Sequence, residues 1–254
     1  MIRDGQLSAR QMVVVTDHVI HRFWYAEHVD HWFLSSELGL ETLQRWLIDP
    51  QGITVSGMPV HPKWTQPLDR ERIYAEWYLP RHRKIVLLTG GTEFVCGPVV
   101  KVARGVLEAC GDACVVLLAG RNKKLLAELS SLGREPDRLI AVAFTDRVHE
   151  LVEVCSLMIT KAGGSTTAEC LAKGTPMVLL KSVPGQEAGN AAYLQREGAA
   201  VTTRKTSEVV AQTRRLLNDP AALAQLAQNA RRLYRPATQT IVDAIVKAVQ
   251  PGTA

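Results

Sequence analysis

The chain has 254 residues, of which 46% are hydrophobic, and its 30 Lys and Arg against 25 Asp and Glu give a net charge of +5. No apolar run approaches the ~20 residues of a membrane-spanning helix, and no helix-turn-helix, RNA-binding or zinc-finger pattern supports nucleic-acid binding. The five cysteines are odd in number and lack CxxC spacing, which argues against a disulfide framework.

Residues 1–62 show the pattern of only part of a sheet. Strands are expected at Met12–Thr16, Val29–Leu34 and Ile53–Val55, and helices at Ile20–Ala26 and Ser36–Leu47. Three prolines, Pro59, Pro62 and Pro67, then predict a linker, which we place at residues 63–84.

From Ile85 the chain repeats a unit of one short apolar strand and one amphipathic helix. The expected strands are Ile85–Thr89, Cys114–Ala119, Leu139–Ala143, Leu157–Thr160, Met177–Leu180 and Ala199–Val201. The helices between them are expected at Val99–Cys110, Lys123–Leu132, Asp146–Val154, Ser165–Lys173 and Ala188–Glu197. Such alternation predicts a parallel sheet covered on both faces, with ligands bound beyond the carboxyl ends of the strands.

Three further helices are expected after the last strand, at Ser207–Leu217, Ala221–Tyr234 and Thr238–Val249. Arg235-Pro236 separates the last of them from the preceding helix. We therefore expect residues 85–235 to form one Rossmann-like domain and residues 236–254 to form a separate terminal helix.

The most informative segment is the one with the pattern KxGGxTxxE, which runs from Lys161 to Glu169. Gly163-Gly164 lets the backbone approach a ligand, and Ser165 and Thr166 begin a helix whose outward N–H groups suit a phosphate. Glu169 lies one turn further along, where a carboxylate can accept hydrogen bonds from a ribose diol. A glycine pair alone would indicate only a tight turn, and the GxGxxG and GxxxxGK[ST] patterns are absent, so the whole string carries the prediction.

A second string, PGQExxN, follows the next strand and spans residues 184–190. Its polar side chains, Gln186, Glu187 and Asn190, suit the hydroxyl groups of a sugar. Phosphate, ribose and sugar groups in this order predict a nucleotide sugar as the ligand. The histidines at 18, 21, 28 and 31 lack a carboxylate pattern such as HExxH, so no metal site is predicted.

These strings resemble the donor-site region of glycosyltransferases with the two-domain GT-B fold, in particular diacylglycerol glucosyltransferases and monogalactosyldiacylglycerol synthases. The lipid II-forming N-acetylglucosaminyltransferase is a more distant relative. Residues 13–24 resemble the TDxxxHxxW segment of that family, and residues 56–62 resemble its GxPxxP signature. The resemblance implies an α/β fold of GT-B type, in which residues 1–62 are the last part of a first, acceptor-side domain. It also implies that the terminal helix packs back toward that domain.

The same resemblance implies an inverting, metal-independent enzyme that transfers a hexose from a UDP-sugar to diacylglycerol or a related lipid and needs no cofactor. The implied donor-site residues are Gly90, Gly91, Phe144, Gly163, Gly164, Ser165, Thr166, Glu169, Gln186, Glu187 and Asn190. The glycine-rich GGGH-type loop that supplies the family's base histidine has no match, so the catalytic base is unassigned, with Asp17 and His21 as candidates.

The resemblance places the protein in the cytoplasm, bound peripherally to the inner face of the cell membrane. Basic clusters at residues 81–84, 121–124 and 231–232 would favour an anionic membrane surface over a neutral one. Two alternatives stay open. The chain could be a non-catalytic donor-binding fragment or subunit that needs a partner chain for the first domain, or, with less support, a UDP-sugar epimerase.

Overall fold

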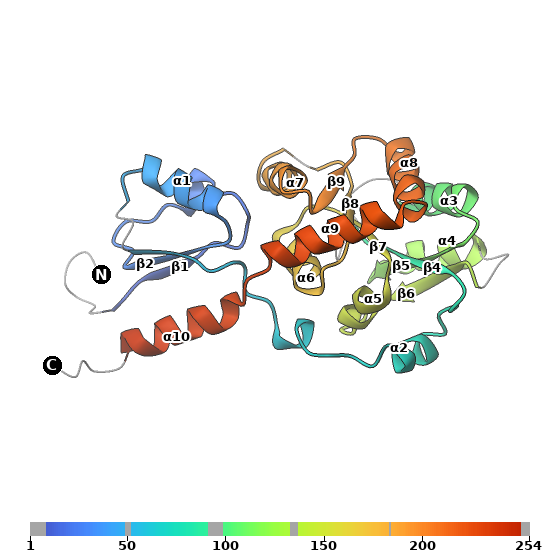
Figure 1. The fold of residues 1–254 in the computed structure, drawn as a ribbon, viewed down its shortest axis with the longest axis horizontal. Coiled ribbons are helices and arrows are strands. Elements are labelled where there is room, and N and C mark those ends of the chain that lie inside the picture. Colours follow the sequence, from blue (N-terminus) through green and yellow to red (C-terminus); the bar gives the residue numbers. More distant parts are fainter. Residues whose placement is uncertain (1–8, 49–51, 91–98, 133–136, 183, 250–254) are drawn as a thin grey trace.

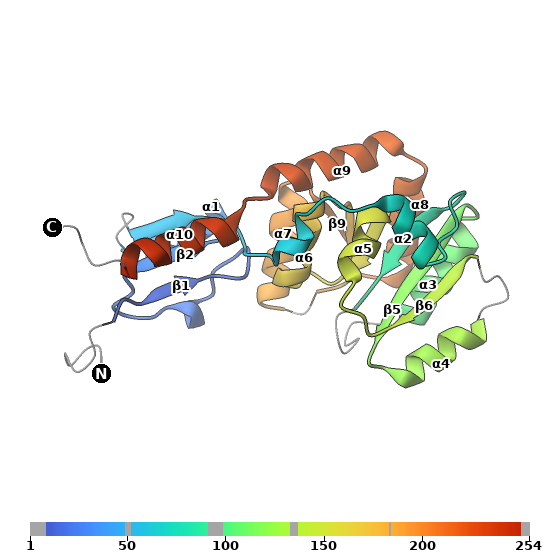
Figure 2. The same ribbon diagram turned by 90° about the horizontal axis from the view of Figure 1, so that it is seen from below.

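The structure is a computed structural model, and it describes residues 9–48, 52–90, 99–132, 137–182 and 184–249. Two parallel sheets, of three and six strands, organise these residues. Figures 1 and 2 show the smaller sheet at one end of an elongated molecule and the larger sheet at the other. The predicted α/β class with parallel sheets is therefore confirmed.

The smaller sheet has the order β1 (Met12–Val14), β2 (His31–Leu34) and β3 (Ile53–Val55), with helix α1 (Glu37–Arg45) between the last two strands. Successive side chains of a strand point to opposite faces. Trp32 and Leu34 accordingly pack with Val15 and Leu43 on one face, whereas Phe33 faces the other.

The helix expected at Ile20–Ala26 does not form. Only one 3₁₀ turn, η1 (Arg22–Trp24), is present. The His21 backbone is extended and its Nδ1 accepts a hydrogen bond from the Phe23 N–H, so helical backbone begins at Arg22. Tyr25 is extended again, which ends the turn after three residues.

The larger sheet has the strand order β6-β5-β4-β7-β8-β9. Its strands are β4 (Lys84–Leu88), β5 (Ala113–Gly120), β6 (Leu139–Ala143), β7 (Leu157–Thr160), β8 (Met177–Leu179) and β9 (Ala200–Thr202). The chain builds outward from β4 through β5 to β6 and then returns to the other side of β4 with β7. The pair β4 and β7 is thus the point where the strand order reverses, and such points form ligand crevices in open parallel sheets.

Helices cover both faces of the larger sheet. One core contains Ile85 and Leu87 and packs against α2 (Arg70–Glu76), α5 (Val148–Val154), α6 (Gly164–Lys173) and α7 (Gln186–Arg196). The other contains Val86 and Leu88 and packs against α3 (Val99–Ala109), α4 (Lys123–Leu132) and α8 (Thr206–Leu217), and α9 (Pro220–Leu233) contributes to both cores. The strands are buried on both sides because alternate residues supply the two cores, which explains why they read as continuous apolar runs.

Residues 63–84, predicted as a linker, are part of this larger core. A 3₁₀ turn, η3 (Pro62–Trp64), and helix α2 occupy much of the segment. Trp64, Ile73 and Leu79 are buried in the first core, and the Trp77 indole N–H donates to Glu150 at 2.8 Å. Prolines therefore marked where the elements begin and end, and did not mark a flexible connection.

The terminal helix α10 (Ala237–Val249) lies along the smaller sheet in Figures 1 and 2. Ala237 and Ile241 are buried against Phe33, and Ala244 packs at the edge of the same cluster. Among the described residues, no helix combines the length and the apolar character needed to cross a membrane.

Candidate functional site

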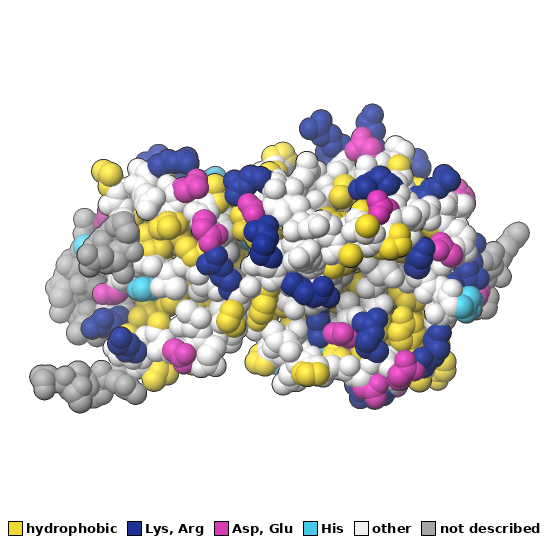
Figure 3. Space-filling view, viewed as in Figure 1, with side chains coloured by type: hydrophobic (Ala, Val, Ile, Leu, Met, Phe, Trp, Pro, Cys, Tyr) yellow, Lys and Arg dark blue, Asp and Glu magenta, His cyan; other side chains and the backbone are white. Residues whose placement is uncertain are grey.

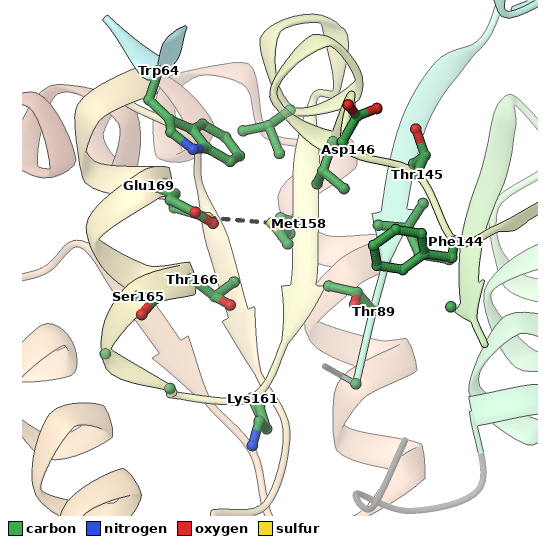
Figure 4. Close-up of a pocket in the computed structure, with 18 of the residues that line it drawn as sticks. Trp64, Thr89, Phe144, Thr145, Asp146, Met158, Lys161, Ser165, Thr166 and Glu169 are labelled. Carbon is green, nitrogen blue, oxygen red and sulfur yellow. Dashed lines mark hydrogen bonds between the residues drawn. The ribbon is translucent and has the colours of Figure 1, made fainter. Parts of the chain in front are cut away.

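A cavity of about 690 Å³ lies at the carboxyl ends of the central strands of the larger sheet. Its lining comes from β5, from the segments that follow β4, β6 and β7, from α5, from the first turns of α6 and from η3. Figure 4 shows side chains from these elements converging on one space. The lining includes Gly90, Phe144, Gly163, Gly164, Ser165, Thr166 and Glu169, so the structure brings together seven of the residues predicted to bind the donor.

The start of α6 supplies the polar wall of this cavity. Gly163 is the N-cap residue and offers no side-chain cap, and Ser165 and Thr166 line the cavity. The first N–H groups of a helix have no intrahelical acceptor, and they lie at the positive end of the helix dipole. This wall can therefore accept an anionic group.

Glu169 lies one turn into α6 and is half-buried beside the cavity. Burial raises the pKa of its carboxyl to about 7, and Lys63 opposes that shift. No hydrogen bond to this carboxylate is found within the described residues. A half-buried acceptor of this kind suits a ligand that brings hydroxyl donors.

Phe144 follows β6 and leaves 55% of its side chain exposed at the cavity wall. The Arg121 guanidinium lies 4.8 Å from the centroid of its ring. Gly90 follows β4 and also lines the cavity, whereas Gly91 falls outside the described residues.

The two glycines of the pair differ in what surrounds them. A Cβ placed on Gly163 would contact only Lys161 Cε, at 3.7 Å. A Cβ placed on Gly164 would lie 2.0 Å from the Thr16 carbonyl oxygen, which belongs to the segment after β1. Gly164 therefore lets the smaller sheet approach α6, a reason that the motif alone did not reveal.

Asn190, predicted to contact the hexose, lies at the junction between the two parts of the molecule. It is fully buried, and its Oδ1 accepts from the His18 N–H at 2.7 Å. Its Nδ2 donates to Asp17 Oδ1 at 2.8 Å and to the Ala162 carbonyl at 3.1 Å. Both ends of the amide are bonded to the chain, and Asn190 is not among the residues that line the cavity.

The His18 ring is part of the same junction. It stacks on Tyr193 of α7 with a centroid distance of 4.8 Å, and burial lowers its pKa to about 3. The ring is therefore neutral at physiological pH. Gly189 completes the contact, because a Cβ there would lie 2.5 Å from Val19 Cγ2.

Gln186 and Glu187 do not line the cavity but begin α7 close to it. Gln186 is exposed. Glu187 is half-buried and its Oε1 accepts from Lys161 Nζ at 2.8 Å, while Lys161 does line the cavity. The predicted helix began only at Ala188, so its start was placed two residues too late.

The two candidates for the catalytic base differ in position. Asp17 Oδ1 would lie 3.2 Å from a Cβ on Gly164, so this carboxylate adjoins the polar wall. His21 is the exposed N-cap residue of η1, where its ring accepts from the Phe23 N–H and contacts the Phe23 ring. The geometry favours Asp17 over His21.

Sequence reasoning missed several lining residues, namely Lys63, Trp64, Thr145, Asp146 and Lys161. Lys63 Nζ donates to the Asp146 carbonyl at 2.8 Å, which ties η3 to the segment after β6. Treating residues 63–84 as a linker concealed Lys63 and Trp64. Lys161 is inside the motif, but only the glycines, the hydroxyl residues and Glu169 were given a role.

Most of the predicted basic clusters are paired with acids. Arg81 bonds to Glu71, Arg83 lies 2.9 Å from Asp137, Lys84 lies 2.8 Å from Asp112, and Arg232 lies 3.4 Å from Glu197. On the face seen in Figure 3, basic and acidic side chains are interspersed and no large area carries a single sign.

Comparison with known proteins agrees with this geometry. The glycosyltransferase family 28 C-terminal domain matches residues 85–246. The processive diacylglycerol beta-glucosyltransferase of Bacillus cereus (strain AH187) is 34% identical over 235 residues, which are 92% of this chain and 60% of that protein. The chain thus spans about three fifths of the length of this curated relative.

Solved structures share the fold at lower identity. MurG of Acinetobacter baumannii superposes with a TM-score of 0.66 at 18% identity, covering 97% of this chain and 69% of that one. The UDP-GlcNAc 2-epimerase of Neisseria meningitidis, bound to UDP-GlcNAc, gives a TM-score of 0.69 at 16% identity, covering 89% and 64%. The resemblance to diacylglycerol glucosyltransferases is confirmed, and the chain belongs to the glycosyltransferases of family 28.

Proposed function

We propose that the protein binds a UDP-hexose in this cavity and transfers the hexose to diacylglycerol or a related lipid. The observation that carries the proposal is the start of α6, where N–H groups without an intrahelical acceptor and the half-buried Glu169 border one cavity at the reversal of strand order. The names of the relatives support the same donor and acceptor classes, since they include a diacylglycerol glucosyltransferase and a fold neighbour bound to UDP-GlcNAc.

In this proposal the parts of the donor follow the order of the lining residues. The diphosphate lies on the N–H groups at Gly164–Thr166, and the ribose hydroxyls donate to Glu169. The uracil lies at Phe144, where resemblance to the family implies backbone contacts. The hexose extends toward Gln186 and Glu187 at the start of α7.

The acceptor hydroxyl oxygen attacks the anomeric carbon as the bond from that carbon to the UDP oxygen breaks. A base removes the hydroxyl proton, and UDP leaves with the charge of its diphosphate increased. Fixed N–H dipoles at the start of α6 stabilise this charge, because they need no reorganisation during the reaction. Attack opposite the leaving group inverts the anomeric configuration. Asp17 is the candidate base nearest to the polar wall.

A lipid acceptor requires contact with a membrane, so we propose that the protein acts peripherally at the inner face of the cell membrane. Unpaired basic side chains near an anionic surface each contribute ~1 kcal/mol. Lys123 and Lys124 are exposed at the start of α4 and are the predicted basic residues that suit this role.

Calorimetric titration with UDP and with UDP-glucose tests donor binding directly. Glu169→Ala should weaken UDP binding at least about tenfold, because a hydrogen bond to a charged group contributes ~1.5–3 kcal/mol. An unchanged affinity would count against the assigned ribose site. A large fall in melting temperature without ligand would instead indicate a structural glutamate.

The product assay separates the functional alternatives. The chain is incubated with labelled UDP-glucose or UDP-galactose, with and without diacylglycerol in anionic vesicles. Glycolipid formation supports the transferase. Conversion of the UDP-sugar in the absence of lipid would identify an epimerase, and donor binding without any product would indicate a donor-binding subunit that needs a partner chain.

A further inference from the structure

Lys161 occupies the end of the cavity where the proposed donor carries its phosphates. It follows β7 directly, and only Ala162 separates it from the glycine pair. Its Cε would be 3.7 Å from a Cβ on Gly163, so the lysine stem runs beside the N-cap of α6. Figure 4 shows it below Ser165 and Thr166, at the opposite end of the site from Trp64 and Asp146.

Among the described residues that line the cavity, Lys63 and Lys161 carry a positive charge, and they lie at different ends of the cavity. Lys63 bonds to the Asp146 carbonyl and partly opposes the rise in the pKa of Glu169 that burial causes. A UDP-sugar brings two negative charges on its diphosphate. In the proposed binding mode these charges lie at the start of α6, whereas Lys63 faces the ribose end near Glu169. Lys161 is the described lining cation that adjoins the start of α6.

The ammonium of Lys161 is held by Glu187. Their ion pair is 2.8 Å long, with the lysine side chain 30% exposed and the glutamate 21% exposed. Glu187 Oε2 is buried and has no hydrogen-bond partner among the described residues, so this carboxylate depends on Lys161 for its charge balance. An ammonium has three donors, so a bond to Glu187 and a bond to a phosphate oxygen are compatible.

We propose that Lys161 binds the diphosphate of the donor, while Glu187 shares its ammonium without contacting the phosphates. This inference rests on the proposed function, since it names a further contact to the same nucleotide sugar. It also changes the role predicted for Glu187, whose Oε1 is bonded to Lys161 and whose Oε2 is buried.

Two substitutions break the same ion pair but differ in what they leave at the phosphates. Lys161→Met removes the cation from the cavity, whereas Glu187→Gln leaves it there. We expect K161M to weaken UDP binding by about tenfold or more, because charge-assisted bonds to phosphate are strong. We expect E187Q to stay within about threefold of the unsubstituted chain, and uridine, which lacks phosphate, to bind all three proteins alike.

Calorimetry with UDP and NMR titration with uridine supply these affinities, with Lys101→Met on the exposed surface of α3 as the control. Lys161→Gln is the second variant, because its amide can still bond to Glu187 if K161M fails to fold. Equal losses of UDP affinity in K161M and E187Q would overturn the proposal, since only the ion pair would then matter. Absence of UDP binding by the unsubstituted chain would contradict the proposed function itself, whereas unchanged UDP binding in K161M and K161Q contradicts only the role of Lys161.

Discussion

Glu169 links the protonation of one side chain to donor binding. Its pKa of about 7 results from burial, which disfavours the charged form. Ribose hydroxyls donate best to the ionised carboxylate, so binding below pH 7 must first remove a proton. Affinity for UDP-glucose is therefore expected to rise about tenfold between pH 6 and pH 8. The rise should vanish in Glu169→Gln.

Calorimetry with UDP-glucose is the suitable measurement, because UDP has a terminal phosphate that titrates near pH 6. Stability should show the opposite trend. The folded carboxyl holds its proton up to about pH 7, while the unfolded one loses it near the ordinary value of 4.5. The unfolding free energy thus falls as pH rises through this window. A melting temperature of E169Q that tracks the unsubstituted protein at every pH would contradict this account.

Single residues also show where sequence reasoning succeeds and where it ends. The hydroxyls and carboxylate of KxGGxTxxE could be predicted as cavity residues because their spacing along one helix is fixed. Asn190 belonged to an equally specific string, yet its amide bonds to Asp17 and His18, more than 170 residues away in the chain. Periodicity describes neighbours on one element and carries no information about which distant segment will meet it.

At the scale of elements, the start of α6 has two neighbours, the cavity and the Thr16 segment. Both glycines line the cavity, but only Gly164 also packs against the Thr16 segment. Gly164→Ala would place a methyl group 2.0 Å from the Thr16 carbonyl oxygen, so the backbone of one segment must move. We expect a loss of ~1–3 kcal/mol in unfolding free energy. Gly163→Ala meets only the flexible Lys161 stem, at ordinary contact distance, and serves as the matched control.

Urea denaturation of the two alanine variants measures this difference. G163A should unfold within about 0.5 kcal/mol of the unsubstituted chain, the usual range for a substitution that meets no obstacle. If G163A were the more destabilised variant, the contact between α6 and the Thr16 segment would not be the reason for the second glycine.

The elements themselves were predicted well where strand and helix alternate, because buried parallel strands and amphipathic helices have distinct periods. The failures lie where local signals were short or ambiguous. His21 caps a single turn in place of the helix expected at Ile20–Ala26. In residues 63–84, the prolines led to the prediction of a linker, so the seven-residue helix α2 was missed. Its N-terminal signal was nevertheless present, because the Asp69 side chain accepts from the Glu71 and Arg72 N–H groups.

At the scale of the whole molecule, the smaller sheet depends on elements from the far end of the chain. Its three short strands bury few side chains of their own, and α10 covers Phe33 with Ala237 and Ile241. A small sheet needs such packing for stability. The described residues that line the cavity, by contrast, all fall between Lys63 and Cys170, outside the smaller sheet.

Substitution of Ile241 by Asp should destabilise the smaller sheet while leaving the larger sheet and its cavity intact. Ile241 is 7% exposed, so a carboxylate there is buried against Phe33 without a partner. Val242 on the same helix is 47% exposed, and Val242→Asp is the matched control. In hydrogen exchange, peptides covering β1 and β2 should lose protection in I241D but not in V242D. Peptides covering β4 and β5 should stay protected in both, and UDP affinity should stay within about threefold. Loss of UDP binding in I241D with β4 and β5 still protected would show that the donor site needs the smaller sheet, through the contacts of Thr16 and Asp17 with the start of α6.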